Sequence, residues 1–363
     1  MVRPVGLENR AWGQGGVPLN ISPPRTSPRS RPLSFLPLSA TADPTFAALD
    51  LGTNNCRMLV ARPAPHGFRV VDAFSRVTRL GEGLAVSGRL SEIAMERTIT
   101  ALRACVDKMA RNRVTHGRLV ATEACRQAAN CEPFRQRVLA ETGLHLDIIS
   151  PEEEAALALA GCASLLDART PWALVFDIGG GSTELVWVRN DGGRQIVEGV
   201  QSLATGVVTL AERFARELTS LDGYRRIVED IATALSPFEG RHAIADRLAW
   251  GEVQMLGTSG TVTTLAALHL GLARYDRSQV DGIVLDFVDI RRVTERLAAM
   301  TAAERRAHPC IGPERADLVV AGCAILEAVC LLWPLGRLRV ADRGVREGVL
   351  LALMREEAKV VAV

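Results

Sequence analysis

The order of apolar and polar positions predicts strands and helices in alternation from about residue 46 onward. Two stretches, FAALDLGTNNCRMLVAR from Phe46 and LVFDIGGGSTELVWVR from Leu174, each consist of an apolar run, a short polar turn and a second apolar run. This arrangement is typical of a β-hairpin. In the second half, Asp191-Gly192-Gly193 predicts another turn into a third strand.

The two hairpins correspond to each other at a fixed offset in the chain. Asp50 matches Asp177 and Gly52 matches Gly179, so the offset is 177 − 50 = 127 residues. Helices follow the strands in both halves, which indicates the α/β class. The repeat predicts two duplicated halves with a cleft between them, where both turns can face one ligand.

Apolar residues at helical spacing predict the intervening helices. Ser91 is the expected N-cap of a helix to about residue 112, and Gly143 is the expected end of another. Ser150-Pro151 begins an Ala-rich helix, and a strand at 118–124 is expected to end in a loop at Arg126. Later helices are predicted near residues 207–218, 224–235, 289–304, 314–332 and 345–358.

Composition divides the chain into three parts. Residues 1–44 hold 8 of the 17 prolines and only two acids, which predicts a disordered Pro/Arg/Ser-rich extension. The first domain is expected at 45–157 and the second at 158–344. The C-terminal helix at about 345–358 is expected to pack back on the first domain.

Charge and cysteine content exclude several classes of protein. A net charge of +2 over 363 residues argues against a nucleic-acid binder. The apolar stretch 318–333 is too short and interrupted to span a membrane, so it is predicted to be a buried helix. The eight cysteines form no C-x-x-C pair, which predicts reduced, buried thiols and a cytoplasmic protein.

The glycines of the second hairpin predict a phosphate site. A P-loop is excluded because no lysine follows them, and a dinucleotide motif is disfavoured because they lead into a strand. Exposed N–H groups at Gly179, Gly180 and Gly181, with the hydroxyls of Ser182 and Thr183, would suit a phosphate. Asp177, paired by the repeat with Asp50, would hold Mg²⁺, unless these acids only close their turns. Gly257-Thr258-Ser259-Gly260-Thr261 is a third small-residue turn that opens a helix.

Taken together, these motifs resemble the exopolyphosphatase/guanosine pentaphosphate phosphohydrolase family, within the actin-like (ribonuclease H-like) superfamily. The resemblance rests on ALDLGTNNCRMLVA, ATEACR, IISPEEEA, VFDIGGGSTELV, GTSGT and ADRGVREGVL, in family order. It implies Mg²⁺-assisted hydrolysis of a terminal phosphate from polyphosphate or guanosine pentaphosphate. It further implies Glu154 as the base toward water, Arg126 as a phosphate clamp, Asp177 and Asp50 at the metal, and Glu184 as a further catalytic acid.

The phosphate contacts implied by motif and resemblance come from all three turns: Gly52, Thr53, Asn54, Asn55, Gly179, Gly180, Gly181, Ser182, Thr183, Gly257, Ser259 and Gly260. Thr53 and Asn55 replace serines common in the family, which leaves selectivity between the two substrates open. The extra C-terminal domain of longer relatives is not expected here. In the family that domain helps to hold the polymer, so its absence would affect processive hydrolysis of long polyphosphate. An ATP-dependent kinase or ATPase of the same fold, or a non-hydrolytic guanosine tetra- or pentaphosphate sensor, remains an alternative. A homodimer through the 318–333 helix also remains open.

Overall fold

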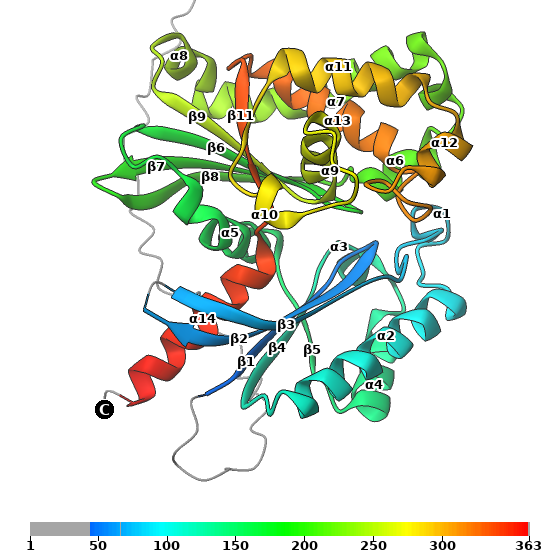
Figure 1. Cartoon of the computed structure of the whole chain (residues 1–363). Helices are drawn as coiled ribbons and strands as arrows, with labels where there is room; N and C mark the ends of the chain where they lie inside the picture. Colours follow the sequence, from blue (N-terminus) through cyan, green and yellow to red (C-terminus); the bar gives the residue numbers. More distant parts are fainter. Residues whose placement is uncertain (1–43, 66, 362–363) are drawn as a thin grey trace, which may run out of the picture.

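Two mixed β-sheets, one from each half of the chain, organise the computed structural model, which describes residues 44–65 and 67–361 (Figure 1). The first sheet has the order β3-β2-β1-β4-β5. Its strands are β1 (Phe46–Leu51), β2 (Asn55–Ala64), β3 (Gly67–Val77), β4 (His116–Ala121) and β5 (Leu146–Ile148). β1, β2 and β3 are antiparallel, and β4 and β5 continue parallel to β1.

The second sheet repeats this plan. Its order is β10-β11-β9-β6-β7-β8, in which β6, β7 and β8 are antiparallel, while β9 and β11 run parallel to β6. The strands are β6 (Trp172–Ile178), β7 (Thr183–Asp191), β8 (Arg194–Leu203), β9 (Val253–Thr258), β10 (Val284–Asp286) and β11 (Arg337–Ala341). The duplication predicted from the two hairpins is therefore present in whole sheets.

Helices cover both faces of the first sheet, which explains why its central strand β1 is apolar almost throughout. On one face, α2 (Glu92–Arg111) and α4 (Cys131–Thr142) pack against inward residues of β1, β2 and β4. On the other face, α14 (Val345–Val361) contributes Val345, Val349 and Leu350 to a cluster with Phe46 and Ala48. The C-terminal helix therefore packs on the first sheet, although it follows the second.

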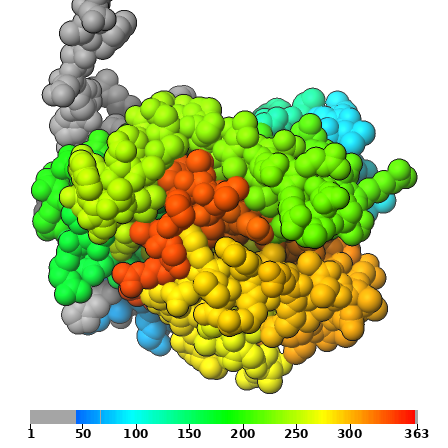
Figure 2. Space-filling view, turned by 90° about the horizontal axis from the view of Figure 1, so that it is seen from above, coloured from blue at the N-terminus to red at the C-terminus, as the bar shows by residue number. Residues whose placement is uncertain are grey.

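The second sheet is covered in the same way. Alternate residues of β6 point to opposite faces, so that Leu174 and Phe176 lie in one core cluster and Ala173 and Val175 in another. The first cluster is covered by α7 (Leu221–His242), α9 (Gly260–His269), α11 (Phe287–Ala299) and α13 (Val319–Leu332). The second is covered by α5 (Pro151–Cys162). Seen from above, the second half of the chain, green through orange, forms most of the visible face (Figure 2).

The helices α5 and α14 cross between the two sheets, and their backbones are in direct contact at the crossing (Figure 1). A Cβ atom on Gly348 would lie 2.0 Å from the carbonyl oxygen of Leu157. A Cβ atom on Gly161 would lie 2.1 Å from the carbonyl oxygen of Gly344. Only glycine permits this approach, so these residues set the distance between the connecting helices.

Local signals in the sequence set most helix ends as predicted. Ser91 accepts a hydrogen bond from Ala94 N, Ser150 accepts one from Glu153 N, and Gly143 ends α4 in the left-handed region. Several expectations need correction. Arg126 lies in the short helix α3 (Glu123–Gln127) and not in a loop, and α13 begins only at Val319. The helix predicted at 207–218 ends at Arg213, and the one predicted at 224–235 extends from Leu221 to His242. The remaining elements are α1 (Leu84–Ser87), η1 (Ala163–Leu165), α6 (Val207–Arg213), η2 (Glu217–Thr219), α8 (Ile244–Ala249), α10 (Arg277–Val280) and α12 (Ala302–Ala307).

The predicted extension at 1–44 lies outside the described residues, apart from Pro44. α13 is buried in the core of the second half, as its apolar sequence predicted. Among the described residues, no helix is both long and apolar enough to cross a bilayer. All eight cysteines are free thiols, and all but Cys330 are buried.

Candidate functional site

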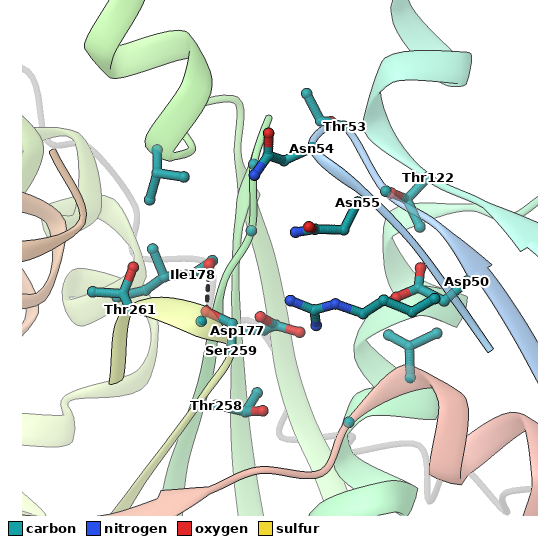
Figure 3. A pocket seen from close by; sticks show the side chains of 18 of the residues that line it. Asp50, Thr53, Asn54, Asn55, Thr122, Asp177, Ile178, Thr258, Ser259 and Thr261 are labelled. Carbon is teal, nitrogen blue, oxygen red and sulfur yellow. Dashed lines mark hydrogen bonds between the residues drawn. The ribbon is translucent and has the colours of Figure 1, made fainter. Parts of the chain in front are cut away.

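A cavity of about 130 Å³ lies between the two sheets, at the ends of their first strands (Figure 3). Both hairpin turns line it, together with the start of α9, the start of α14 and Glu154 of α5. The predicted residues that line the cavity are Asp50, Gly52, Thr53, Asn54, Asn55, Glu154, Asp177, Gly179, Gly180, Gly181, Ser182, Ser259 and Gly260. The three turns singled out in the sequence therefore meet at one place.

The two hairpin turns have the same backbone hydrogen bond. Gly52 N donates to Asn55 O at 2.9 Å, and Gly179 N donates to Ser182 O at 2.9 Å, at the same 127-residue offset. Within the described part of the chain, the N–H groups of Gly180 and Gly181 have no acceptor in the protein. Unsatisfied donors beside a cavity are the property that an anion-binding turn requires.

The glycines also allow the two hairpins to touch. A Cβ atom on Gly180 would lie 3.0 Å from Cβ of Thr53, and one on Gly181 would lie 2.5 Å from Oγ1 of Thr53 and 3.0 Å from Cγ of Glu123. The sequence predicted that these glycines expose their N–H groups to a phosphate. In the structure, these two positions make room first for the opposite hairpin and for α3.

Asp50 and Asp177 point into the cavity from opposite sides (Figure 3). Within residues 44–65 and 67–361, neither carboxylate has a hydrogen bond or an ion pair. Burial raises the pKa of Asp50, although Arg57 and Arg346 oppose the rise. Burial and the nearby Glu184 and Asp50 raise the pKa of Asp177 to about 7.

This pair of acids fits Mg²⁺ better than it fits a structural role. Two partly enclosed carboxylates without partners are costly unless a cation joins them. The described residues contain no group of three or more His, Cys, Asp or Glu side chains placed to hold a metal ion. Mg²⁺ does not need such a group, because it keeps several waters and binds through one or two carboxylates and substrate phosphates.

Asp177→Asn is expected to stabilise the metal-free protein at pH 8 and to have little effect near pH 4. Because burial raises the pKa of Asp177 from 3.8 to about 7, the native state loses stability as pH rises between these values. At about 1.4 kcal/mol per pKa unit, the ionised carboxylate lowers the free energy of unfolding by a few kcal/mol above pH 7. Thermal melts in EDTA between pH 4 and pH 8 measure the difference.

Asp107→Asn, an exposed position on α2, is the matched control and should behave as wild type at every pH. Adding Mg²⁺ at pH 8 should stabilise the wild type and leave Asp177→Asn almost unchanged. A variant that melts below wild type at pH 8 without metal would contradict the proposed cost of the buried charge.

Glu154 lies at the cavity wall with 8% of its surface exposed. Arg126 Nη1 donates to Glu154 Oε2 at 2.8 Å. On the other edge of the guanidinium, Nη2 and Nε donate to Glu123 Oε2 at 2.8 and 2.9 Å. Burial, followed by the charge of Glu184, raises the pKa of Glu154 well above its usual value, although Arg126 opposes this. A carboxylate whose pKa is raised toward neutrality is suited to accept a proton from water.

Arg126 does not line the cavity, so its predicted role as a phosphate clamp is not supported by this geometry. Both edges of its guanidinium are occupied by Glu123 and Glu154. Arg126 instead fixes the position and the charge of Glu154. A phosphate clamp at Arg126 would require these two ion pairs to open.

Three further predicted residues lie behind the cavity wall. Glu184 is buried and accepts hydrogen bonds from Ser182 Oγ at 2.6 Å and from Ser202 Oγ at 3.0 Å. Thr183 donates its hydroxyl to Thr205 O at 2.7 Å, and Gly257 faces the ring of Phe176. The predicted phosphate contacts of Thr183 and Gly257 are therefore corrected. The hydroxyl of Thr183 already donates to Thr205 O, and Gly257 leaves room for the ring of Phe176.

Comparison with known proteins identifies the family of the chain. The model of the Ppx/GppA phosphatase family matches residues 59–357. The chain belongs to this family. Among curated relatives, exopolyphosphatase 2 of Mycobacterium tuberculosis is 29% identical over 85% of this chain and 98% of its own length. The guanosine-5'-triphosphate,3'-diphosphate pyrophosphatase of Vibrio vulnificus is 28% identical over 86% of this chain and 60% of its own length.

Solved structures show the same fold. The Aquifex aeolicus member of the Ppx/GppA family is 30% identical, with a TM-score of 0.71 over 87% of this chain and 99% of the other. An exopolyphosphatase-like protein is 31% identical, with a TM-score of 0.75 over 86% of this chain and 99% of the other. The predicted fold, α/β with two duplicated actin-like halves, is confirmed.

In this Ppx/GppA phosphatase, the cavity is also lined by four arginines that were not predicted from the sequence: Arg57, Arg315, Arg343 and Arg346. Arg343 is held by Asp281 at 2.6 Å, and Arg315 donates to Thr264 Oγ1 at 3.2 Å. Among the described residues, Arg57 and Arg346 have no hydrogen bond or ion pair. Burial and the neighbouring Arg57 lower the pKa of both Arg315 and Arg346, in keeping with cations crowded around an empty polar space.

The repeat itself contained the signal for Arg57. Arg57 faces Asp50 across the first hairpin, and Glu184 faces Asp177 across the second. The offset is again 184 − 57 = 127 residues. Equivalent positions in the two hairpins therefore carry opposite charges in this chain: the cation Arg57 in the first and the carboxylate Glu184 in the second.

Proposed function

We propose that this chain is a Mg²⁺-dependent phosphohydrolase that releases the terminal phosphate of inorganic polyphosphate or of guanosine pentaphosphate. The observation that supports this most directly is the position of Glu154 at a cavity that also contains carboxylates and arginines without partners among the described residues. The similarity of the chain to an exopolyphosphatase and to a guanosine-5'-triphosphate,3'-diphosphate pyrophosphatase supports the same chemistry.

Glu154 is the base in this proposal. It takes a proton from a water molecule as the water oxygen forms a bond to the terminal phosphorus and the anhydride P–O bond breaks. The hydrogen bond from Arg126 keeps the carboxylate oriented, with one oxygen held and the other available. The products are orthophosphate and a substrate shortened by one phosphate, which leaves with the electron pair of the broken bond.

Asp177 and Asp50 would hold Mg²⁺, directly or through water. Bound there, the ion would offset the negative charge of the phosphates and help to orient them. The N–H groups of Gly180 and Gly181 and the guanidinium of Arg57 are the protein's own donors toward the phosphate oxygens. They are in place before the reaction, so they stabilise developing charge without reorganisation.

The test is phosphate release from tripolyphosphate, long-chain polyphosphate and guanosine pentaphosphate, each with Mg²⁺ and with EDTA. We expect release that depends on Mg²⁺ and no ADP formation from ATP in the presence of phosphate acceptors. ADP formation without release from the other substrates would favour a kinase or ATPase. Tight binding of guanosine polyphosphates without turnover would favour a sensor.

Arg57→Gln is expected to raise the KM for tripolyphosphate about tenfold or more, because it removes a cation that no described residue pairs with from a site for polyanions. Glutamine keeps the stem and a donor, so the hairpin should fold normally. Steady-state kinetics at fixed Mg²⁺ and a thermal melt separate affinity from stability.

Arg62→Gln is the control, since Arg62 lies on the same strand but bonds to Thr45 Oγ1 and does not line the cavity. It should keep wild-type kinetics. An unchanged KM in Arg57→Gln would show that the guanidinium does not contact substrate.

A further inference from the structure

A buried carboxylate that the proposed mechanism does not use lies behind Glu154. Glu123 begins α3 shortly after β4 ends, and only 8% of its surface is exposed. The next two residues, Ala124 and Cys125, are buried in the core of the first half of the chain. α3 is therefore held firmly against the first sheet, although it is only five residues long.

Both carboxylate oxygens of Glu123 accept hydrogen bonds from its own helix. Oε2 accepts from Arg126 Nε at 2.9 Å and from Arg126 Nη2 at 2.8 Å, and Oε1 accepts from Gln127 Nε2 at 2.9 Å. Two charge-assisted hydrogen bonds from adjacent nitrogens fix the plane of a guanidinium as well as its distance. The remaining nitrogen, Nη1, donates to Glu154 Oε2 at 2.8 Å and to Ile149 O at 3.0 Å. The arginine that holds Glu154 is therefore itself held by Glu123.

Glu123 also touches the turn that is proposed to bind the phosphate. A Cβ atom on Gly181 would lie 3.0 Å from Cγ of Glu123 and 3.2 Å from its Cβ. The Glu123 side chain therefore lies directly against the backbone of Gly181. Gly181 belongs to the second half of the chain, whereas Glu123 and Arg126 belong to the first. The orientation of Glu154 and the place of the phosphate turn are thus set at one contact between the halves.

The charge of Glu123 affects Glu154 through the same arginine. Burial and then the charge of Glu184 raise the pKa of Glu154, and Arg126 opposes the rise. An arginine that interacted with Glu154 alone would stabilise the ionised carboxylate more strongly and make it a weaker acceptor of a proton. Because Glu123 shares the guanidinium, it limits this effect while the hydrogen bond to Glu154 stays in place.

We propose that Glu123 is a positioning residue for hydrolysis: it holds the guanidinium of Arg126 so that Arg126 orients Glu154 toward the attacking water. Glu123 does not meet the water itself and acts only through Arg126. This inference rests on the proposed function, in which Glu154 is the base, and adds the residue that keeps the base aligned with the phosphate turn. A buried cluster of ion pairs with a structural role alone would affect folding and have no specific effect on turnover.

Glu123→Gln is the test variant, because glutamine keeps the shape of the side chain and an acceptor oxygen but removes the charge. The matched control is Glu132→Gln, since Glu132 forms an exposed ion pair with Arg135 at 3.1 Å on α4 and does not line the cavity. Both substitutions are made in the wild type and in Glu154→Gln. The kcat and KM for tripolyphosphate are measured at saturating Mg²⁺, and a thermal melt confirms that each variant is folded.

The expected result is a loss of turnover that depends on Glu154. Glu123→Gln should lower kcat about tenfold or more, the usual effect of losing a hydrogen bond between charged groups. The KM should stay within about twofold of the wild-type value, because Glu123 does not contact substrate. In the Glu154→Gln background, the same substitution should change kcat by less than about twofold, since no base remains to be oriented. The control should have no effect in either background.

Three outcomes of these kinetics would overturn the inference. The first is an unchanged kcat in Glu123→Gln. The second is an equal loss of kcat in both backgrounds, which would mean that Glu123 acts independently of Glu154. The third is an effect confined to KM, which would make Glu123 a contact of the substrate. None of the three removes the proposed function, because the wild type would still hydrolyse tripolyphosphate.

A measurement without turnover keeps the inference separate from the proposed function. Rotation of the Arg126 guanidinium about its Nε–Cζ bond is followed by NMR exchange on isotope-labelled arginine side chains, without substrate. Rotation should be slow in the wild type, where both edges of the guanidinium are held, and about tenfold faster or more in Glu123→Gln. If the wild type hydrolyses no substrate, the proposed function fails, and the rotation rates alone decide whether Glu123 holds Arg126. Equal rates in the two proteins would overturn the inference.

Discussion

Glu154→Gln is expected to lower kcat for phosphate release by about 10²–10⁴-fold, the usual contribution of a general base. Glutamine has the same shape and can still accept the hydrogen bond from Arg126, so the fold should be preserved. It cannot take a proton from water. The KM should change little, because Glu154 contacts the attacking water and not the bulk of the substrate. Steady-state kinetics on tripolyphosphate at saturating Mg²⁺ measure both quantities.

Glu153→Gln is the control, and it changes the adjacent residue in the same way. Glu153 forms an ion pair with Arg118 at 2.7 Å and does not line the cavity, so its loss should leave kcat near the wild-type value. The pH profile gives a second check, since the raised pKa of Glu154 predicts that wild-type activity rises with pH as the carboxylate ionises. If Glu154→Gln turns over within a few-fold of wild type, another group is the base.

Gly348→Ala is expected to lower the thermal midpoint of the protein strongly. The new methyl group would lie 2.0 Å from the carbonyl oxygen of Leu157, and backbone cannot turn aside as a side chain can. Overpacking of this kind costs about 1–3 kcal/mol or more, while the gain in helix propensity is only about 1 kcal/mol. The clash should therefore dominate, and α14 should separate from α5.

Gly240→Ala is the matched control, because Gly240 is also helical but has no atom within 4 Å of the position of a Cβ. There the same substitution should raise the midpoint slightly, by the propensity term alone. Opposite shifts in the two variants, measured by differential scanning fluorimetry and circular dichroism, would confirm the crossing. A Gly348→Ala protein as stable as wild type would mean that the helices can move apart without cost.

Local patterns predicted the fold because each half carries its own signals. The hairpins, the caps at Ser91 and Ser150 and the helix end at Gly143 depend on residues close in sequence. The duplication was visible as one short offset between Asp50 and Asp177, and the structure extends it to strand order and register. The position of the two acids in one cavity followed from that repeat.

Residues whose partners are distant in sequence were harder to interpret. Arg126 was assigned to substrate, but its guanidinium is held by Glu123 and by Glu154, which lies 28 residues away. Arg346 reaches the cavity only because α14 returns to the first sheet. A pattern along the chain cannot show such neighbours, since they depend on how the elements pack. Arg57 is different, because it lies opposite Asp50 within one short hairpin and matches Glu184 at the 127-residue offset.

The return of α14 to the first sheet has a consequence for synthesis. Phe46 and Ala48 are made early, but the residues that cover them, such as Val349 and Leu350, are translated some 300 positions later. The first sheet of a nascent chain therefore keeps part of one apolar face open to water, and to chaperones, until α14 leaves the ribosome. The N-terminal half cannot finish folding before the C-terminal helix arrives, so a prematurely released chain would present that uncovered face as a surface for aggregation.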